Sequence, residues 1–252
     1  MPLTNGTSQR TDPIAWTEAA TTSRPVIVEL VGPAGAGKTA VLREIGRRDP
    51  RVRAGLSIDR LRFSAEMARH AVALLPTMLA LGQRSPNSWW RGTLHLLRLR
   101  TLPSVLAHQA DSAFRAIILD EGPVFSLSRL CVFQNANRTG GRITREWHAA
   151  LERCVRWLDG IVWLDASDEV LLQRIRTRDK APIIKNGTEA DLARLLTQYR
   201  DAYRDVLAAV RAVGGVRIIE VDTARESSQQ VADDILAALP SLRTRTEPAR
   251  GQ

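Results

Sequence analysis

The feature that most constrains this chain is a glycine-rich stretch near its amino end. Residues 32–39 read Gly-Pro-Ala-Gly-Ala-Gly-Lys-Thr, which matches the phosphate-binding loop pattern G-x-x-x-x-G-K-[ST]. The apolar, β-branched run at 26–31 predicts a buried strand before the loop. Apolar residues at helical spacing follow it until Asp49-Pro50 ends the pattern. A chance glycine-rich turn is the alternative, but this strand-loop-helix order favours a nucleotide site.

Each residue type in the loop has a physical role. Glycines let the backbone fold closely around a phosphate chain, at φ and ψ values that a Cβ would forbid. The N–H groups and positive dipole end of the following helix then face the anion. Lys38 should reach the β- and γ-phosphates of ATP, and the Thr39 hydroxyl should ligate Mg²⁺. The expected nucleotide contacts are Gly32, Ala34, Gly35, Ala36, Gly37, Lys38 and Thr39.

Composition narrows the class of protein. The 252 residues, 44% hydrophobic and 25% charged, suit one globular core. Cys131 and Cys154 lack metal or redox spacing, which favours a reduced, cytoplasmic setting. Residues 1–24 are polar and unlike a secretory leader. The longest apolar run, 71–81, contains Pro76 and falls short of the ~20 residues of a membrane span, so we expect no such span.

The net charge of +9 raises the question of nucleic-acid binding. Only three of the 36 basic residues are lysines, and the arginines are spread along the chain rather than grouped. A nucleotide site also benefits from excess positive charge. Polynucleotide binding is therefore not the favoured interpretation.

Strand and helix patterns alternate along the chain. The predicted strands are 26–31, 52–58, 116–119, 161–165 and 216–221, and helices are predicted at 124–135, 144–158, from 167, from 189 and at 227–239. This alternation predicts an α/β domain of three layers, in which helices flank a five-stranded parallel sheet. The domain should span 25–240, with a loose arm at 1–24 and a polar tail at 241–252. Within it, 62–108 is apolar and helical; two helices packed over the sheet are favoured, and a lid or a partner surface is the alternative.

Acidic residues follow three of the predicted strands, and those after the second and third strands are candidate site residues. Asp120 and Glu121 end the strand 116–119, and an acid there is what Mg²⁺ coordination beside a phosphate loop requires. We expect Asp120 to be the metal-side residue, with Glu121 as its rival and as a substrate contact; capping of the next helix is the structural alternative. Asp59 and Arg62 follow the second strand, at the edge where open α/β sheets bind ligands.

Taken in order, these pieces resemble the P-loop nucleotide and nucleoside kinase group, and the segment 161–178 looks like the strand and lid helix of thymidylate-kinase-like enzymes. The resemblance covers most of 25–240 and implies a P-loop NTPase fold with ATP and Mg²⁺ as cofactors. Asp59 would then orient or deprotonate an attacking hydroxyl, and Arg62 would hold the acceptor. Arg174 and Arg178, one turn apart on a helix, would close over the transferred phosphoryl group. A charged turn and a solvated helix face are the respective alternatives.

Two departures from the group concern the acceptor. Thymidylate and deoxynucleoside kinases usually place an arginine where this chain has Glu121, and the lid loop offers Lys180 and Lys185 instead of an arginine cluster. The leading hypothesis is a kinase that moves the γ-phosphoryl group of ATP onto a small-molecule hydroxyl or phosphate. A nucleotide-switched binding module and a polynucleotide kinase are the alternatives. The acceptor is not specified by the sequence, and a homodimer remains open.

Overall fold

The computed structural model describes residues 24–56, 95–104, 106, 113–135, 145–177 and 188–242. The strands are β1 (Val26–Val31), β2 (Val52–Leu56), β3 (Ala116–Leu119), β4 (Gly160–Asp165) and β5 (Arg217–Asp222), and the labelled helices are α1 (Lys38–Arg48), α4 (Pro123–Asn135), α5 (Arg145–Val155), α6 (Asp168–Arg176), α7 (Glu189–Val213) and α8 (Ser228–Leu242). A further helical segment covers 95–104. Most of the predicted arm, of the tail and of the 62–108 region lies outside the described residues.

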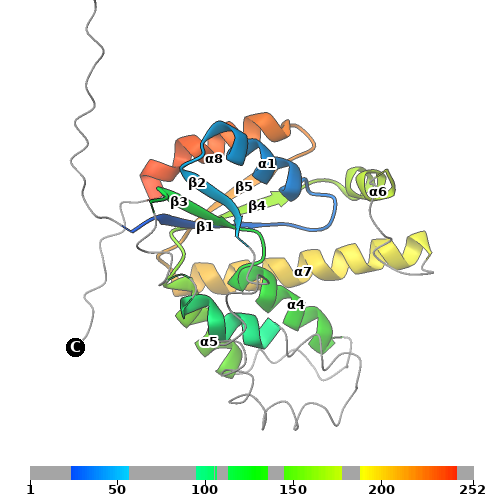
Figure 1. Ribbon diagram of the computed structural model, residues 1–252. Coiled ribbons are helices and arrows are strands. Elements are labelled where there is room, and N and C mark those ends of the chain that lie inside the picture. Colours follow the sequence, from blue (N-terminus) through cyan, green and yellow to red (C-terminus); the bar gives the residue numbers. More distant parts are fainter. Residues whose placement is uncertain are drawn as a thin grey trace, which may run out of the picture.

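The strands form one parallel sheet in the order β2-β3-β1-β4-β5, which confirms the predicted α/β class (Figure 1). β1 is central, because it pairs with β3 on one side and with β4 on the other. The chain runs outward from β1 to β2, returns through β3, and then crosses β1 to build β4 and β5. The loop after β1 therefore lies where the strand order reverses, the position at which open α/β sheets bind ligands.

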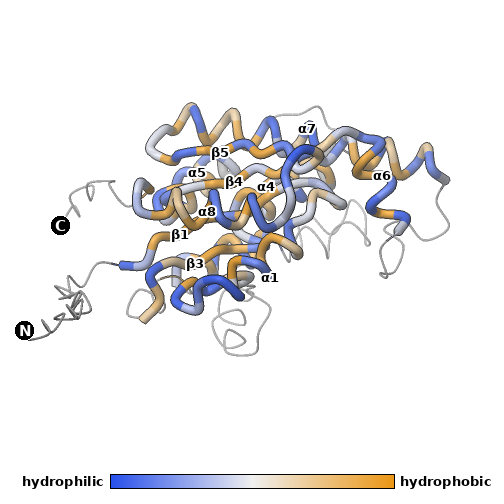
Figure 2. Tube along the Cα trace, turned by 90° about the horizontal axis from the view of Figure 1, so that it is seen from above, coloured by the Kyte–Doolittle hydropathy of each residue, from blue (hydrophilic) through white to orange (hydrophobic). Residues whose placement is uncertain are grey.

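The central strand is buried on both faces, so helices cover both sides of the sheet. Val28 and Leu30 pack with residues of α1 and α8, whereas Ile27 and Val31 pack with α4, α5 and α7. Figure 1 shows α1 and α8 on one face and α4, α5 and α7 on the other. In Figure 2 the hydrophobic colour runs along β1 and β4, while α7 and α8 alternate between the two colours. Within the described residues, no helix combines the length and apolar character that a bilayer crossing requires.

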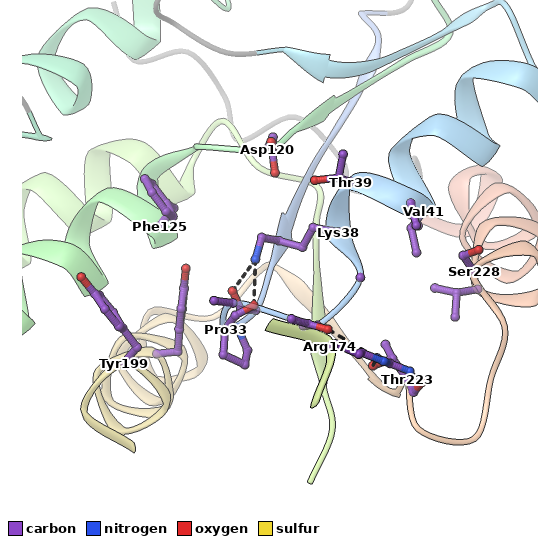
Figure 3. Close-up of a pocket in the computed structure, with 18 of the residues that line it drawn as sticks. Pro33, Lys38, Thr39, Val41, Asp120, Phe125, Arg174, Tyr199, Thr223 and Ser228 are labelled. Atoms are coloured by element: carbon purple, nitrogen blue, oxygen red, sulfur yellow. Dashed lines mark hydrogen bonds between the residues drawn. The ribbon is translucent and has the colours of Figure 1, made fainter. Parts of the chain in front are cut away.

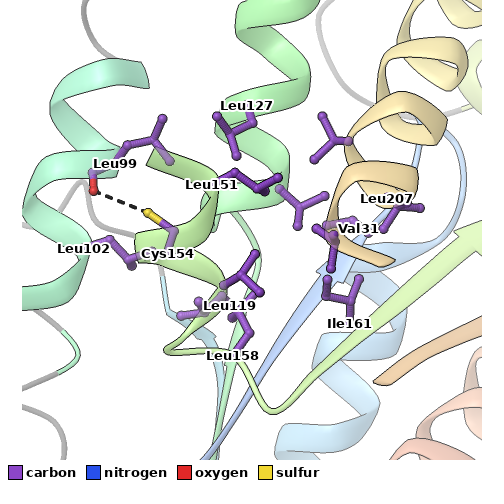
Figure 4. Close-up of a cluster of buried hydrophobic side chains, with 14 of the residues drawn as sticks. Val31, Leu99, Leu102, Leu119, Leu127, Leu151, Cys154, Leu158, Ile161 and Leu207 are labelled. Carbon is purple, nitrogen blue, oxygen red and sulfur yellow. Dashed lines mark hydrogen bonds between the residues drawn. The ribbon is translucent and has the colours of Figure 1, made fainter. Parts of the chain in front are cut away.

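The helical segment 95–104 belongs to the core beside α5. Leu99 and Leu102 are buried in that core, and the Cys154 thiol donates to the carbonyl oxygen of Leu99 at 3.7 Å (Figure 4). This part of the apolar region 62–108 thus packs as a helix against α5. The lid and interface interpretations concern the remainder, which lies outside the described residues.

The last helix extends beyond its predicted end at 239. α8 continues through Pro240 to Leu242, whose side chain is 5% exposed. A Cβ added to Gly160, at the start of β4, would lie 2.8 Å from Cδ1 of Leu242, so the leucine packs directly on that glycine. Burial of Leu242 offsets the hydrogen bond that a proline removes from the final turn.

β5 is an edge strand that pairs with β4 alone among the described strands. Its burial pattern is mixed, unlike that of β1, and the side chains of Arg217, Glu220 and Asp222 are exposed. This edge of the sheet therefore carries charge.

Candidate functional site

A cavity of about 810 Å³ opens at the carboxyl ends of the strands. The phosphate-loop residues 32–39 line its floor, and Asp120 and Glu121 line it from the end of β3. Figure 3 shows the cavity between the loop, α4, α7 and the turn that follows β5. Its other walls are formed by Phe125 and Arg129 of α4, Leu192, Leu195, Leu196, Tyr199 and Tyr203 of α7, Arg174 of α6, and residues from Thr223 to Val231.

The loop is packed so closely that Gly32 and Gly35 have no room for side chains. A Cβ on Gly32 would lie 2.3 Å from the carbonyl oxygen of Leu164 in β4, and one on Gly35 would lie 2.8 Å from that of Leu171 in α6. Gly35 and Gly37 also have φ angles of 85° and 90°, in the left-handed region. The loop thus lies in close contact with β4 and α6.

Lys38 is the first residue of α1, and its side chain points back over the loop. Its Nζ donates to the carbonyl oxygens of Gly32 at 2.6 Å and Pro33 at 3.1 Å (Figure 3). Gly37, in the left-handed conformation, is the N-cap of α1, and no side chain caps this helix. The amino end of α1, with its positive dipole end, thus faces the cavity together with an ammonium group, and this combination favours a phosphate.

Thr39 and Asp120 line the cavity on the same side, as Figure 3 shows. Within the described residues, no three His, Cys, Asp or Glu side chains converge as a metal cluster. Mg²⁺ in nucleotide sites needs no such cluster, because it is held by one or two protein oxygens, waters and the substrate phosphates. A hydroxyl and a carboxylate beside the phosphate loop fit this requirement.

Glu29 is a buried acid in the centre of the sheet, directly beneath this edge. Its Oε2 accepts a hydrogen bond from the N–H of Val124 and its Oε1 accepts one from the N–H of Phe125, each at 2.9 Å. Burial raises the pKa of Glu29 from 4.5 to about 7, hydrogen bonds from the N–H groups of Phe125, Val124 and Gly122 limit the rise, and the charge of Asp120 adds to it. The carboxyl group therefore titrates near neutral pH.

The far end of the cavity combines aromatic and charged groups. The Arg129 guanidinium lies 5.1 Å from the ring centroid of Phe125 and 4.2 Å from that of Tyr199, and it donates to the Tyr199 hydroxyl. Arg98, which is almost fully buried, pairs with Glu121 at 2.9 Å. This end of the cavity thus combines two aromatic rings, the Arg129 guanidinium between them, and the Glu121 carboxylate that Arg98 holds.

Arg174 lies on the opposite side, where it joins α6 to the turn after β5. Its Nη2 donates to the carbonyl oxygen of Thr223 at 2.7 Å, and its Nη1 donates to Thr223 Oγ1 at 3.0 Å and to the carbonyl oxygen of Gly35 at 3.4 Å. The same helix packs through Leu171 and Ile175, which are buried. Arg174 thus holds the turn against the phosphate loop.

The structure brings together Lys38, Thr39, Asp120, Glu121 and Arg174. Asp59, Arg62 and Arg178 lie outside the described residues. Sequence reasoning missed Phe125, Arg129, Tyr199 and Thr223, which line the cavity, and Glu29, which lies beneath its edge. Only Glu29 left a signal in the sequence, as a lone acid in an apolar strand.

No protein-family model matches the sequence, and no curated protein does. Among solved structures, deoxyadenosine kinase from M. mycoides with bound dATP matches with a TM-score of 0.51 at 14% identity, over 85% of this chain and 100% of that chain. The chain therefore shares its fold with this enzyme.

Two further solved structures match the chain with lower TM-scores. The same M. mycoides enzyme with bound dCTP has a TM-score of 0.49 at 13% identity, over 86% of this chain and 100% of its own. The YorR protein from Bacillus subtilis, in complex with phosphorylated GDP, has a TM-score of 0.48 at 17% identity, over 88% of this chain and 99% of its own. At these identities the likeness concerns the fold, and activity has to be argued from the site.

We predict that Gly35→Ala destabilises the protein more than Gly37→Ala. Both positions have a left-handed φ, which costs an alanine roughly 1–2 kcal/mol. Only at Gly35 would the new Cβ also meet a backbone atom, because nothing lies within 4 Å of it at Gly37. Urea denaturation of both variants measures the difference. Equal losses would contradict the close packing of the loop on α6.

We also predict a pH-dependent stability difference between the wild type and Glu29→Gln. The pKa of Glu29 is about 7 in the folded state, above its ordinary 4.5, so the folded state binds more protons between these values. The free energy of unfolding of the wild type, relative to the variant, should therefore fall by on the order of 3 kcal/mol as pH rises from 4.5 to 7. Urea denaturation across this range is the measurement; a constant difference would show that Glu29 does not titrate there.

Proposed function

We propose that this protein is an ATP- and Mg²⁺-dependent kinase that transfers a γ-phosphoryl group to a small molecule. The observation that carries the proposal is one cavity in which Lys38, Thr39 and Asp120 line the phosphate-loop side, while Phe125 and Arg129 line the far side. The cavity, of about 810 Å³, has the size of a small-molecule site, and its two sides differ in chemistry. An enzyme that only hydrolyses ATP has no need of the far wall.

Phosphoryl transfer asks the protein mainly for positioning and charge neutralisation. The backbone N–H groups of the loop and the Lys38 ammonium would hold the β- and γ-phosphates in line with the acceptor. Thr39 and Asp120 would hold Mg²⁺, which supplies further neutralisation of the phosphate charge when bound. The glycine-rich loop keeps these donors preorganised, so little reorganisation is needed as charge moves in the transition state.

The nucleotide base would lie toward the turn after β5. Arg174, Thr223 and Ser228 border this part of the cavity. The guanidinium of Arg174 already donates to Thr223 and Gly35, and this favours a role in fixing the base side of the site. For Arg174 to contact the transferred phosphoryl group, as the family resemblance implies, it would have to leave Thr223; Arg178 is the better candidate for that role.

The acceptor would lie against α4 and α7. Flat rings at Phe125 and Tyr199 suit a nucleoside-like or other ring-bearing metabolite, and Glu121, held by Arg98, suits an acceptor hydroxyl. We propose that Asp59 orients or deprotonates the attacking group and that Arg62 binds the acceptor. Both roles rest on the sequence.

The main test is a screen of the purified protein for ADP release stimulated by nucleosides, nucleotides, sugars or oligonucleotides. We predict that Lys38→Ala abolishes the stimulated release, because the γ-phosphate loses its central cation. Val213→Ala, an exposed change at the end of α7, is the control and should leave release unchanged. Turnover in Lys38→Ala equal to that of the wild type would contradict the proposed site.

Asp59→Asn should lower kcat by at least ~10²-fold, the effect expected when a positioned base is lost. KM for ATP should change little, because the phosphate loop is intact. Steady-state kinetics with the best acceptor from the screen is the measurement. Near-normal kcat would remove Asp59 from the mechanism.

The same screen separates the alternatives. ATP turnover that no acceptor stimulates, together with an ATP-dependent complex with a protein, would favour a nucleotide-switched binding module. Stimulation by oligonucleotides that weakens steeply with salt would favour a polynucleotide kinase, because phosphate contacts release counterions.

A further inference from the structure

Glu29 is placed unlike any other residue of the central strand. Every residue of β1 is buried, and the others are apolar. The side chain of Glu29 is on the same face of the sheet as those of Ile27 and Val31, the face covered by α4, α5 and α7. Burial of an acid in this position costs free energy unless its oxygens accept hydrogen bonds.

Both of its oxygens accept hydrogen bonds from the start of α4. They accept from the N–H groups of Val124 and Phe125, each at 2.9 Å, and these are among the first N–H groups of a helix, which have no partner within the helix itself. The residue before the helix, Gly122, has no side chain with which to cap it, and Pro123 has no N–H. Glu29 therefore supplies from a neighbouring strand the cap that the local sequence lacks.

Gly122 lies against the Glu29 carboxylate and leaves no room there for a side chain. A Cβ added there would lie 2.6 Å from Cδ of Glu29 and within 2.9 Å of both carboxylate oxygens. The backbone of the turn thus lies directly against the carboxylate, and any side chain on Gly122 would displace one or the other.

The consequence concerns the residues between β3 and α4. The backbone of Glu29 is paired in register with Leu119, the last residue of β3, and its side chain holds the first turn of α4. One residue therefore holds both ends of the short segment 120–123. That segment carries Asp120 and Glu121 into the cavity.

We propose that Glu29 is a positioning residue for the metal side of the site: by holding both ends of segment 120–123, it sets the place of Asp120 relative to Thr39. The inference rests on the proposed function, because it assigns Asp120 to the metal. A purely structural cap would stabilise the fold and leave the metal dependence of nucleotide binding unchanged.

The experiment measures the ATP Kd of the full chain by calorimetry, with and without Mg²⁺, for the wild type and Glu29→Gln. Glutamine keeps the shape, but only one of its two polar ends accepts an N–H. We expect ATP binding without Mg²⁺ to change less than about threefold, because the phosphate loop is untouched. The improvement that Mg²⁺ brings should fall by roughly 10-fold or more, the usual cost of removing a partner that orients a metal ligand.

Leu242→Ala is the matched control. It removes buried contacts at Gly160, at the opposite ends of the strands, and should lower stability without altering the Mg²⁺ effect. A Glu29→Gln protein whose Mg²⁺ effect equals that of the wild type and of Leu242→Ala would overturn the inference and leave the proposed function standing. A wild type that binds no ATP in either condition would overturn the proposed function, and this inference with it.

Gly122→Ala tests the same contact from the other side and carries the test if Glu29→Gln does not fold. Its Cβ would press on the carboxylate without changing any charge. We expect the Mg²⁺ effect to fall in this variant too. An unchanged effect there would overturn the inference.

Discussion

The site depends on close contact between the phosphate loop and the backbone of two other elements. Gly32 lies against the carbonyl of Leu164 in β4, and Gly35 lies against the carbonyl of Leu171 in α6. Two elements that come more than 100 residues later in the chain therefore border the loop at close range. Arg174 strengthens the same junction, because it links Gly35 to the turn after β5. The nucleotide site is thus formed by elements that are far apart in the sequence.

Positive and negative groups occupy different sides of the cavity. Lys38 and the amino end of α1 bring positive potential to the floor of the cavity, while Asp120 and Glu121 bring negative charge to its rim. The positive groups suit phosphates and the adjacent acids suit a cation, so the two requirements of a metal-nucleotide complex are met by neighbouring strand ends. Glu29 lies beneath them, and burial keeps its pKa near neutrality rather than in the acidic range. It therefore adds only part of a negative charge at neutral pH.

The local sequence was sufficient to predict the phosphate loop and most of the strands and helices. The strand, loop and helix at 26–48 followed from apolar periodicity and from the spacing of the glycines, and the alternation of later strands and helices indicated a parallel sheet. The end of α8 was predicted too early, because Pro240 suggests a stop and the compensating contact of Leu242 with Gly160 joins residues far apart in sequence. The pairing of Arg129 with Tyr199 was beyond prediction for the same reason, since it links α4 to α7. In the sequence, Glu29 is recognisable only as a lone acidic residue in an apolar strand, because its partners are backbone N–H groups of helix α4.

The charged outer strand has a consequence for how copies of this chain can meet. An edge strand offers unpaired backbone groups to any neighbour that presents another edge, and exposed charged side chains are a common protection against such pairing. Arg217, Glu220 and Asp222 give β5 this protection. Two molecules that extended one continuous sheet through β5 would have to bring these charged side chains into the contact, which disfavours self-association at this edge of the sheet.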